Sequence, residues 1–343
     1  MSNSQDHILA TGGLGYIGSH TVVRLIESGY RVSIIDNLDN SSLEVLNRIE
    51  KLSNVRPDFY EGDVRDAKFL ESVFSSNQFD AVIHYAGLKA VGESCEKPEL
   101  YYDVNVVGSL RLLEVMQKHG TNIIVFSSSA TVYGEPEKLP ITESANLSTC
   151  SPYGATKLTV EELLEYTATA RPNMAVGVLR YFNPIGAHPS GLIGEAPQDT
   201  PNNLMPYVTQ VAIGAQPFLR VWGNDYDTHD GTGVRDYIHV VDLADAHLAA
   251  LTYLKAHTGH HVWNIGVGEG YSVLDIVSSF ERENNVKIPY ELMPRRSGDV
   301  ETCYADVSKA KNELGWTAQY GINEMVRDSW NWQKQNPKGY EAT

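Results

Sequence analysis

The sequence is poor in cysteine and has no run of lysine and arginine, and both shortages limit what the protein can do. Its 343 residues include three cysteines, Cys95, Cys150 and Cys303, which lie far apart and are odd in number. A small, scattered and odd-numbered set fits free thiols in a reducing compartment better than a disulfide framework, and we expect no structural zinc or other metal. The formal net charge of -16 disfavours binding to nucleic acid or to anionic membranes. An anionic ligand must therefore be held by local cations.

Long apolar runs are also missing. No stretch approaches the roughly 18 to 20 apolar residues that cross a bilayer. The short, polar segment Met1–His7 leaves no room for a signal peptide, so we expect a cytoplasmic location. With 42% hydrophobic and 20% charged residues, the chain can bury the core of an ordinary globular protein with roughly two domains.

Short apolar runs alternate with helix-like stretches in the first half of the sequence. The runs are Ile8–Ala10, Arg31–Ile35, Asp80–Tyr85 and Asn122–Ser127. This alternation predicts an α/β fold, a Rossmann-type doubly wound parallel sheet that collects its ligand-binding loops at the carboxyl ends of its strands. From Asn183 onward, loops rich in Pro and Gly predict a smaller C-terminal substrate-binding domain. We expect domains at 1–182 and, mainly, 183–343, with residues of about 236–266 returning to the first.

A glycine-rich turn follows the first predicted strand. Gly12, Gly15 and Gly18 form a G-x-x-G-x-x-G pattern before a helical stretch, where backbone N–H groups can approach a pyrophosphate. A tight turn alone could also need these glycines. The second strand ends at Asp36, at a suitable distance for a carboxylate that binds the adenosine ribose. An acid there repels a 2'-phosphate, so the pattern predicts NAD as the cofactor.

Tyr153 and Lys157 lie four residues apart and hence on one face of a predicted helix. Such pairs also occur by chance on amphipathic helices. A tyrosine with a pKa near 10 needs a lowering of about three units, worth roughly 4 kcal/mol, to act as a base at neutral pH. We expect Lys157 and the nicotinamide charge to supply it. A strand ending at Phe126 brings Ser127–Ser129 to the same edge of the sheet, where a hydroxyl can bridge substrate and phenol.

The order of these elements resembles the extended short-chain dehydrogenase/reductases, and several longer segments are similar to motifs of their UDP-galactose 4-epimerase family. These segments are Thr11–His20, Ala86–Ser94, Ser127–Gly134, Arg180–Pro184, Pro201–Pro206 and Gly233–His239. The resemblance implies that Tyr153 is the base, that Lys157 lowers its pKa and holds the nicotinamide ribose, and that Ser129 shares the substrate hydroxyl. It also implies a UDP-hexose substrate and a homodimer.

The resemblance and the expected cleft together predict the binding residues. NAD is expected to be bound by Gly12, Gly15, Tyr16, Ile17, Gly18, Asp36, Asn37, Asn40, Ser41, Asp63, Val64, Tyr85, Ala86, Gly87, Lys89, Asn105, Tyr153, Lys157 and Phe182. The substrate is expected to contact Lys89, Ser129, Tyr153, Asn183, Asn202, Asn203, Leu204, Trp222, Arg235, Arg296, Asp299 and Cys303. The resemblance further implies that a small residue at Cys303 admits N-acetylated sugars, although a cysteine can also simply fill a gap.

Three other functions share parts of this pattern. A sugar-nucleotide 4,6-dehydratase needs an Asp-Glu pair after the serine, where this sequence has Ala130-Thr131. A decarboxylase needs a further cation for a uronic acid, and the sequence assigns none. A non-catalytic NAD-sensing module would have no need of Ser129, Tyr153 and Lys157 together. We therefore expect an isomerase that oxidises C4, turns the keto sugar and reduces it again.

Overall fold

The structure is a computed structural model, which describes residues 5–197, 201, 203–296 and 299–341. Within this part of the chain, seven parallel strands form one sheet in the order β11-β6-β5-β4-β1-β2-β3. The strands are β1 (His7–Thr11), β2 (Arg31–Asp36), β3 (Asp58–Glu61), β4 (Ala81–His84), β5 (Ile123–Ser129), β6 (Ala175–Tyr181) and β11 (Gly259–Ile265). The chain reverses its direction of travel across the sheet at β1 and β4, where such sheets bind their ligands. The predicted fold class is confirmed.

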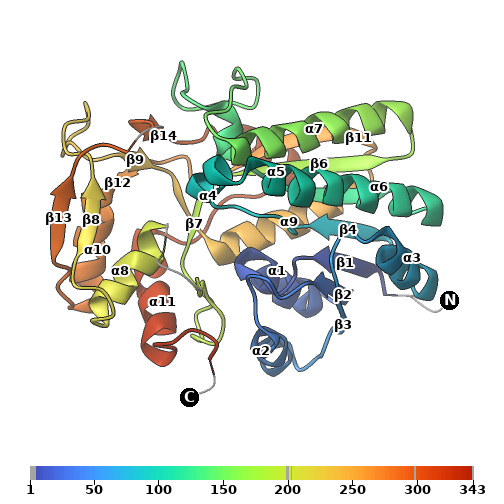
Figure 1. Cartoon of the computed structure of the whole chain (residues 1–343), viewed down its shortest axis with the longest axis horizontal. Helices are drawn as coiled ribbons and strands as arrows, with labels where there is room; N and C mark the ends of the chain where they lie inside the picture. Colours follow the sequence, from blue (N-terminus) through green and yellow to red (C-terminus); the bar gives the residue numbers. More distant parts are fainter. Residues whose placement is uncertain (1–4, 198–200, 202, 297–298, 342–343) are drawn as a thin grey trace.

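Helices cover both faces of this sheet (Figure 1). On one face pack α1 (Tyr16–Glu27), α2 (Leu43–Ser53) and α9 (Val240–Leu254); on the other pack α3 (Ala67–Ser76), α6 (Gly108–His119) and α7 (Pro152–Ala170). In β1, Ile8 and Ala10 contribute to the first core cluster and Leu9 to the second. Both faces of the strand are thus buried, which explains its continuous apolar run.

Strand β5 is longer than the sequence predicted. We expected it to end at Phe126, but it continues through Ser129, which pairs with Tyr181 of β6. The reason is that β6 extends equally far and supplies backbone hydrogen-bond partners for the serine triplet. Ser129 is therefore held by the sheet itself rather than by a loop.

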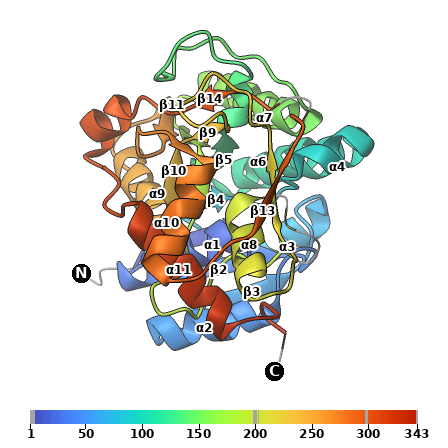
Figure 2. The same cartoon turned by 90° about the vertical axis from the view of Figure 1, so that its left-hand side faces the viewer.

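Smaller sheets and three helices form the other side of the molecule, which faces the viewer in Figure 2. The paired strands are β7 (Asn183–Ile185) with β10 (Tyr237–His239), β8 (Leu219–Trp222) with β13 (Tyr290–Met293), and β9 (Val234–Arg235) with β12 (Tyr271–Ser272) and β14 (Thr302–Cys303). The helices are α8 (Leu204–Ala212), α10 (Val273–Asn284) and α11 (Ile322–Gln335). The short elements α4 (Val91–Glu96), α5 (Pro98–Tyr101), η1 (Tyr102–Val107), η2 (Ala130–Tyr133) and η3 (Ala310–Leu314) complete the described chain.

The helices of the described residues are not membrane spans, because none combines sufficient length with sufficient apolar character to cross a bilayer. Although β11 and α9 come late in the sequence, they belong to the large sheet and its covering layer. The proposed division into two domains stays a prediction.

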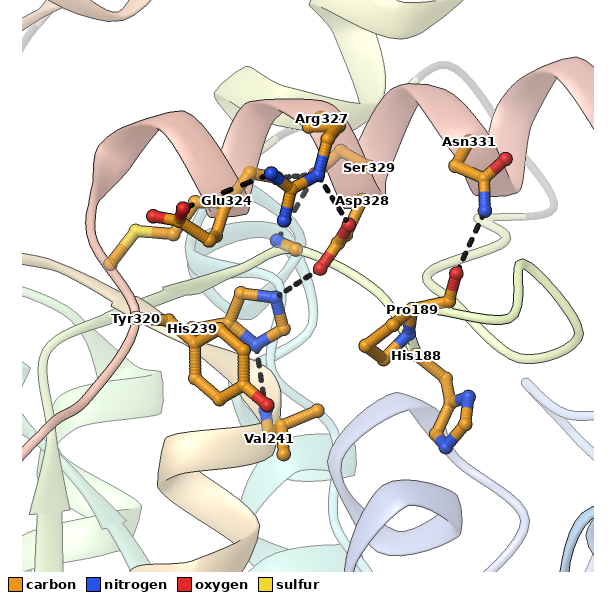
Figure 3. A network of polar contacts seen from close by, with 12 residues as sticks. His188, Pro189, His239, Val241, Tyr320, Glu324, Arg327, Asp328, Ser329 and Asn331 are labelled. Carbon is orange, nitrogen blue, oxygen red and sulfur yellow. Dashed lines mark hydrogen bonds and ion pairs between the residues drawn. The ribbon is translucent and has the colours of Figure 1, made fainter.

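A buried polar network fastens α11 to the start of α9 (Figure 3). His239 is the N-cap of α9, and its Nδ1 accepts a hydrogen bond from the Val241 N–H at 3.1 Å. The proton of the neutral ring therefore lies on Nε2, which donates to Asp328 of α11 at 3.3 Å. The ring of Tyr320 stacks on His239 with centroids 4.4 Å apart. These contacts set where α11 lies against the sheet.

Candidate active site

The turn between β1 and α1 brings two backbone segments close together. Gly12 has a φ of +69°, and a Cβ there would lie 2.7 Å from the Ala86 nitrogen. A Cβ on Gly18 would lie 2.4 Å from the Gly12 carbonyl oxygen. Gly15 is the N-cap of α1 and offers no side chain to its first amide groups. The turn therefore requires glycine and leaves N–H groups at a helix N-terminus, where a phosphate anion binds well.

Asp36 ends β2 beside this turn and is almost fully buried. Its carboxylate accepts hydrogen bonds from the Leu14 and Leu38 amides, each at 3.0 Å, and from the Ser41 hydroxyl at 2.7 Å. A carboxylate has about four lone-pair positions, so one position can still accept from a ribose hydroxyl. Asp36 thus also joins the glycine turn to the loop after β2, which sequence reasoning did not anticipate.

Four more predicted cofactor residues lie on the loops after β2 and β3. The Asn37 amide donates to Asp63 at 3.4 Å. The Arg65 guanidinium binds Asp63 at 2.7 Å and, through this hydrogen bond, lowers the pKa of that carboxyl group. Val64 is buried and Asn40 is exposed. Their contacts to NAD stay predictions.

Asn105 fastens the loop after β4 to α7. Its Oδ1 accepts from the Leu88 amide at 2.8 Å, and its Nδ2 donates to the Leu88 carbonyl at 3.1 Å and to the Thr156 hydroxyl at 2.9 Å. A Cβ on Gly87 would lie 2.9 Å from this Oδ1. Asn105 therefore positions the loop that contains the predicted residues 85–89.

The remaining predicted cofactor residues lie around the same edge of the sheet. The Tyr16 hydroxyl donates to the Gly186 carbonyl at 2.7 Å, and Ile17 packs against the core beside it. Tyr85 directly follows β4 and packs on the ring of His247. Phe182 is buried directly after β6. Tyr16 thus links the glycine turn to the segment that follows β7.

Ser129, Tyr153 and Lys157 meet at the carboxyl edge of the sheet. The hydroxyl of Ser151 caps α7, so Tyr153 lies in the first turn of this helix. The Lys157 ammonium is 5.9 Å from the centroid of the Tyr153 ring, as expected for one helical face. Thr131 donates to the Ser129 hydroxyl through its amide at 3.2 Å and its hydroxyl at 3.0 Å. Ser129 is therefore oriented to donate its own proton.

The charge that acts on the phenol differs from our expectation. Burial raises the pKa of Tyr153, whereas the hydrogen bond with Ser129 and the positive charge of Lys89 lower it. We expected Lys157 and the nicotinamide charge together to supply the lowering; the Lys157 ammonium donates to the Ser127 carbonyl at 2.8 Å. Burial also lowers the pKa of Lys157 to about 8, so its ammonium is still mostly charged at neutral pH.

A buried ion pair supports this region, and sequence reasoning missed it. Glu161 and Arg180 have side chains 4% and 5% exposed and approach to 2.6 Å. Glu161 also accepts a hydrogen bond from Ser128, and Arg180 donates to the Tyr133 hydroxyl at 2.9 Å. A signal was available, because Glu161 follows Lys157 by four residues and so lies on the same helical face.

Several predicted substrate residues lie together on the small sheets. Arg235 of β9 pairs with Cys303 of β14, and its guanidinium donates to the Val234 carbonyl at 2.8 Å. Cys303 is buried in a cluster with Phe182, and burial raises the pKa of its thiol to about 11. Asn183 is exposed in the neighbouring strand β7. The Cys303 thiol is therefore protonated at neutral pH.

A second group of predicted substrate residues joins β8 to the segment after β13. The Arg296 guanidinium lies 5.8 Å from the centroid of the Trp222 ring and binds Asp299 at 3.0 Å. In such a pair, the guanidinium can bind a phosphate while the neighbouring aromatic ring stacks on a base.

The third group lies at the start of α8, whose first residue is Leu204. Its N-cap, Asn203, donates to Glu195 at 2.8 Å, and Lys89 binds the same oxygen at 2.9 Å. Asn202 lies outside the described residues. Glu195 was not predicted from the sequence, where it is one acid among many.

A cluster of His229, Asp230 and Asp275 has the donor atoms of a metal site. However, Asp230 already accepts hydrogen bonds from the Thr232 amide and hydroxyl at 2.8 Å, and from Ser272, which caps α10. These contacts give the cluster a structural role at the start of α10.

Comparison with known proteins identifies the family of the chain. Residues 9–329 match the family model described as GDP-mannose 4,6 dehydratase. The UDP-glucose 4-epimerase of Pasteurella multocida is 56% identical over 334 residues, which cover 97% of this chain and 99% of the relative.

Solved structures with a similar fold are also UDP-glucose 4-epimerases. The UDP-glucose 4-epimerase of Bifidobacterium longum, in complex with NAD+ and UDP, has a TM-score of 0.94 and 50% identity over 97% of this chain and 99% of that one. The epimerase from Stenotrophomonas maltophila, with bound NAD and formylated UDP-arabinopyranose, has a TM-score of 0.95 and 46% identity over the same shares. The chain therefore belongs to the extended short-chain dehydrogenase/reductases covered by the matched model and, within them, to the UDP-glucose 4-epimerases.

Proposed function

We propose that this chain interconverts UDP-glucose and UDP-galactose by oxidising C4 of the hexose, turning the keto sugar and reducing it from the other side. The observation that carries the proposal is the meeting of Ser129, Tyr153 and Lys157 beside the glycine turn, in a chain of this family. A sensing module would not need this trio.

The residues around the glycine turn fit NAD. The close backbone approach at Gly12 and the uncapped N-terminus of α1 suit a pyrophosphate. The Asp36 carboxylate suits an unphosphorylated ribose, and Lys157 lies where it can hold the second ribose. When bound, NAD supplies the oxidation and the reduction of C4.

The protein side of the reaction is a proton transfer. Tyr153 takes the proton of the 4-hydroxyl, and Ser129, oriented by Thr131, hydrogen-bonds the same oxygen. The positive charge of Lys89 lowers the pKa of Tyr153 and so favours the phenolate. After the keto sugar has turned about its link to the diphosphate, its other face lies toward the site, and Tyr153 returns the proton to the C4 oxygen as the hydroxyl re-forms with inverted configuration.

The nucleotide must stay bound while the hexose turns. We propose that the guanidinium groups of Arg235 and Arg296 bind the diphosphate, that Asp299 accepts from the uridine ribose and that Trp222 lines the uracil site. Other substrate contacts are assigned to Lys89, Asn183, Asn202, Asn203 and Leu204. Binding energy concentrated on UDP leaves the sugar free to rotate.

The residues at positions 130 and 131 distinguish an epimerase from a 4,6-dehydratase. Thr131 donates its hydroxyl to Ser129 at 3.0 Å, so it orients the serine. A 4,6-dehydratase needs a carboxylic acid pair here for the elimination of water, and Ala130 and Thr131 carry none. This arrangement favours the epimerase.

We further propose that UDP-GlcNAc and UDP-GalNAc are substrates, because a small residue, Cys303, lies beside Arg235. Cys303→Tyr would fill the space that an N-acetyl group needs. We expect this variant to lose turnover of the N-acetylated pair and to keep that of UDP-galactose. Unchanged turnover of both pairs would contradict the proposal.

The assembly and the location complete the proposal. Leu100, Tyr102, Leu110 and Tyr166 are large exposed hydrophobics on α5, η1, α6 and α7, and η1 contacts each of the other three helices. Covering such a surface with a second copy supports a homodimer, which sedimentation would detect. The unpaired cysteines support the cytoplasm.

The direct test is an assay of purified protein with UDP-galactose and NAD, followed by chromatography for UDP-glucose. Wild type should convert the substrate without net accumulation of NADH. Tyr153→Phe keeps the ring but removes the acid-base group, so conversion should fall about 10²–10⁴-fold. Equal activity of the two proteins would refute the assigned base.

A further inference from the structure

We propose that Glu195 is a positioning residue of the reaction, which holds Lys89 and Asn203 in place at the substrate site. The inference rests on the proposed function. One oxygen, Oε1, accepts from the Lys89 ammonium at 2.9 Å and from the Asn203 amide at 2.8 Å. Lys89 comes from the loop after β4 and Asn203 from the N-cap of α8, so one carboxylate joins two separate elements.

Residues near the C-terminus hold the backbone at Glu195 in place. Its backbone carbonyl accepts from the Trp332 indole N–H at 3.0 Å. A Cβ on Gly194 would lie 2.4 Å from the Trp332 ring, so the indole packs directly on this segment. The Gly194 amide also donates to the Tyr340 hydroxyl at 3.0 Å. Trp332 belongs to α11, so Glu195 is bound to the same helix that the network in Figure 3 joins to the start of α9.

The pair is asymmetric in a way that suits positioning. The Glu195 side chain is 11% exposed, whereas that of Lys89 is 51% exposed. A half-exposed lysine without a fixed partner would sample many rotamers and lose that entropy on binding substrate. With Glu195 in place, the ammonium is already oriented. The Asn203 amide is also exposed, at the N-cap of α8, and Glu195 orients it in the same way before substrate binds.

Glu195 also balances the charge near the base. Although the Lys89 side chain is half-exposed, partial desolvation of its ammonium end disfavours the charged form; the Glu195 carboxylate outweighs this effect and raises the pKa of Lys89. Lys89 therefore remains an ammonium and lowers the pKa of Tyr153, and we expect the opposite charge of Glu195 beside it to offset part of its field. The other titratable groups that face the phenol are Lys157, Tyr101 and Tyr181.

Two variants separate the geometric effect from the charge effect. Glu195→Ala removes the shared acceptor, so the KM for UDP-galactose should rise about tenfold, which corresponds to one or two lost polar contacts, with a smaller change in kcat. Glu195→Gln keeps an acceptor oxygen but not the charge. Its KM should stay within about threefold of wild type, while the acid limb of its kcat profile should move to lower pH by about half a unit. Glu283→Ala, an exposed acid of α10, is the control for lost charge.

The outcomes distinguish this inference from the function on which it rests. A wild type that converts UDP-galactose, together with a Glu195→Ala KM within twofold of wild type or an unshifted Glu195→Gln profile, would overturn the positioning role alone. A wild type without conversion would refute the proposed function. In that case, calorimetry with UDP-galactose still decides the role of Glu195: weaker binding by Glu195→Ala supports it, and an equal Kd overturns it.

Discussion

Replacing the buried lysine of the site should make the cofactor-free protein more stable and nearly inactive. Lys157 is 5% exposed, and burial lowers its pKa from 10.5 to about 8. Methionine has a similar length and no charge. Lys157→Met therefore removes a destabilising charge together with a group that the reaction needs.

The magnitude follows from the pKa difference. A decrease from 10.5 to about 8 corresponds to about 3 kcal/mol against folding when the lysine is charged, at 1.36 kcal/mol per unit. The hydrogen bond to the Ser127 carbonyl is lost in the variant, at a cost of about 1 kcal/mol. Lys157→Met should therefore be more stable than wild type by about 2 kcal/mol at pH 7.

The effect should depend on pH with a defined sign. Between about pH 8 and 10.5 the unfolded chain carries the proton and the folded protein does not, so wild-type stability attributable to this group rises with pH. The penalty is fully present below about pH 8 and absent above 10.5. At pH 9.5 only about 1.4 kcal/mol of this penalty remains. The lost hydrogen bond of about 1 kcal/mol offsets most of it, so the stability advantage of Lys157→Met should nearly disappear.

Urea unfolding of protein freed of NAD, at pH 7 and pH 9.5, measures this difference. Lys68→Met, an exposed lysine of α3, is the matched control and should change stability little at either pH. The kcat of Lys157→Met should fall about a hundredfold or more. A variant that is less stable than wild type at pH 7, or whose advantage is the same at both pH values, would refute the reasoning.

Three further substitutions test the supporting structure. Gly12→Ala places a Cβ 2.7 Å from backbone at a φ of +69° and should lower stability by about 2 kcal/mol or more and weaken NAD binding in a fluorescence titration; unchanged affinity would argue against the close approach. Arg180→Met leaves Glu161 charged and buried, so the melting temperature should fall by about 4–7 °C, and adding Glu161→Leu should restore most of it. His239→Ala removes the cap of α9 and the partner of Asp328 and should lower the unfolding free energy by about 3 kcal/mol; a loss below about 1 kcal/mol in urea unfolding would show that this network contributes little.

The features that depend only on residues close together in the sequence were predicted correctly. The turn with Gly12 and Gly15, the acid Asp36 at the end of β2, and the helical spacing of Tyr153 and Lys157 are each decided by local geometry. Backbone sterics select glycine at positive φ, and helical periodicity places residues four apart on one face. The NAD type of site and the family follow from these short patterns. The end of β5 was predicted too early, because its length depends on β6, which lies far along the sequence.

The sequence by itself thus determined the fold class, the family and the three residues that meet at the carboxyl edge of the sheet, since local patterns encode all of these. Only the tertiary structure decided which charges act on Tyr153. Lys89 and Glu195 are 106 residues apart, and nothing in their spacing reveals that one carboxylate joins Lys89 to Asn203. The energy of a charge depends on its distance and burial, which exist only after the chain has folded.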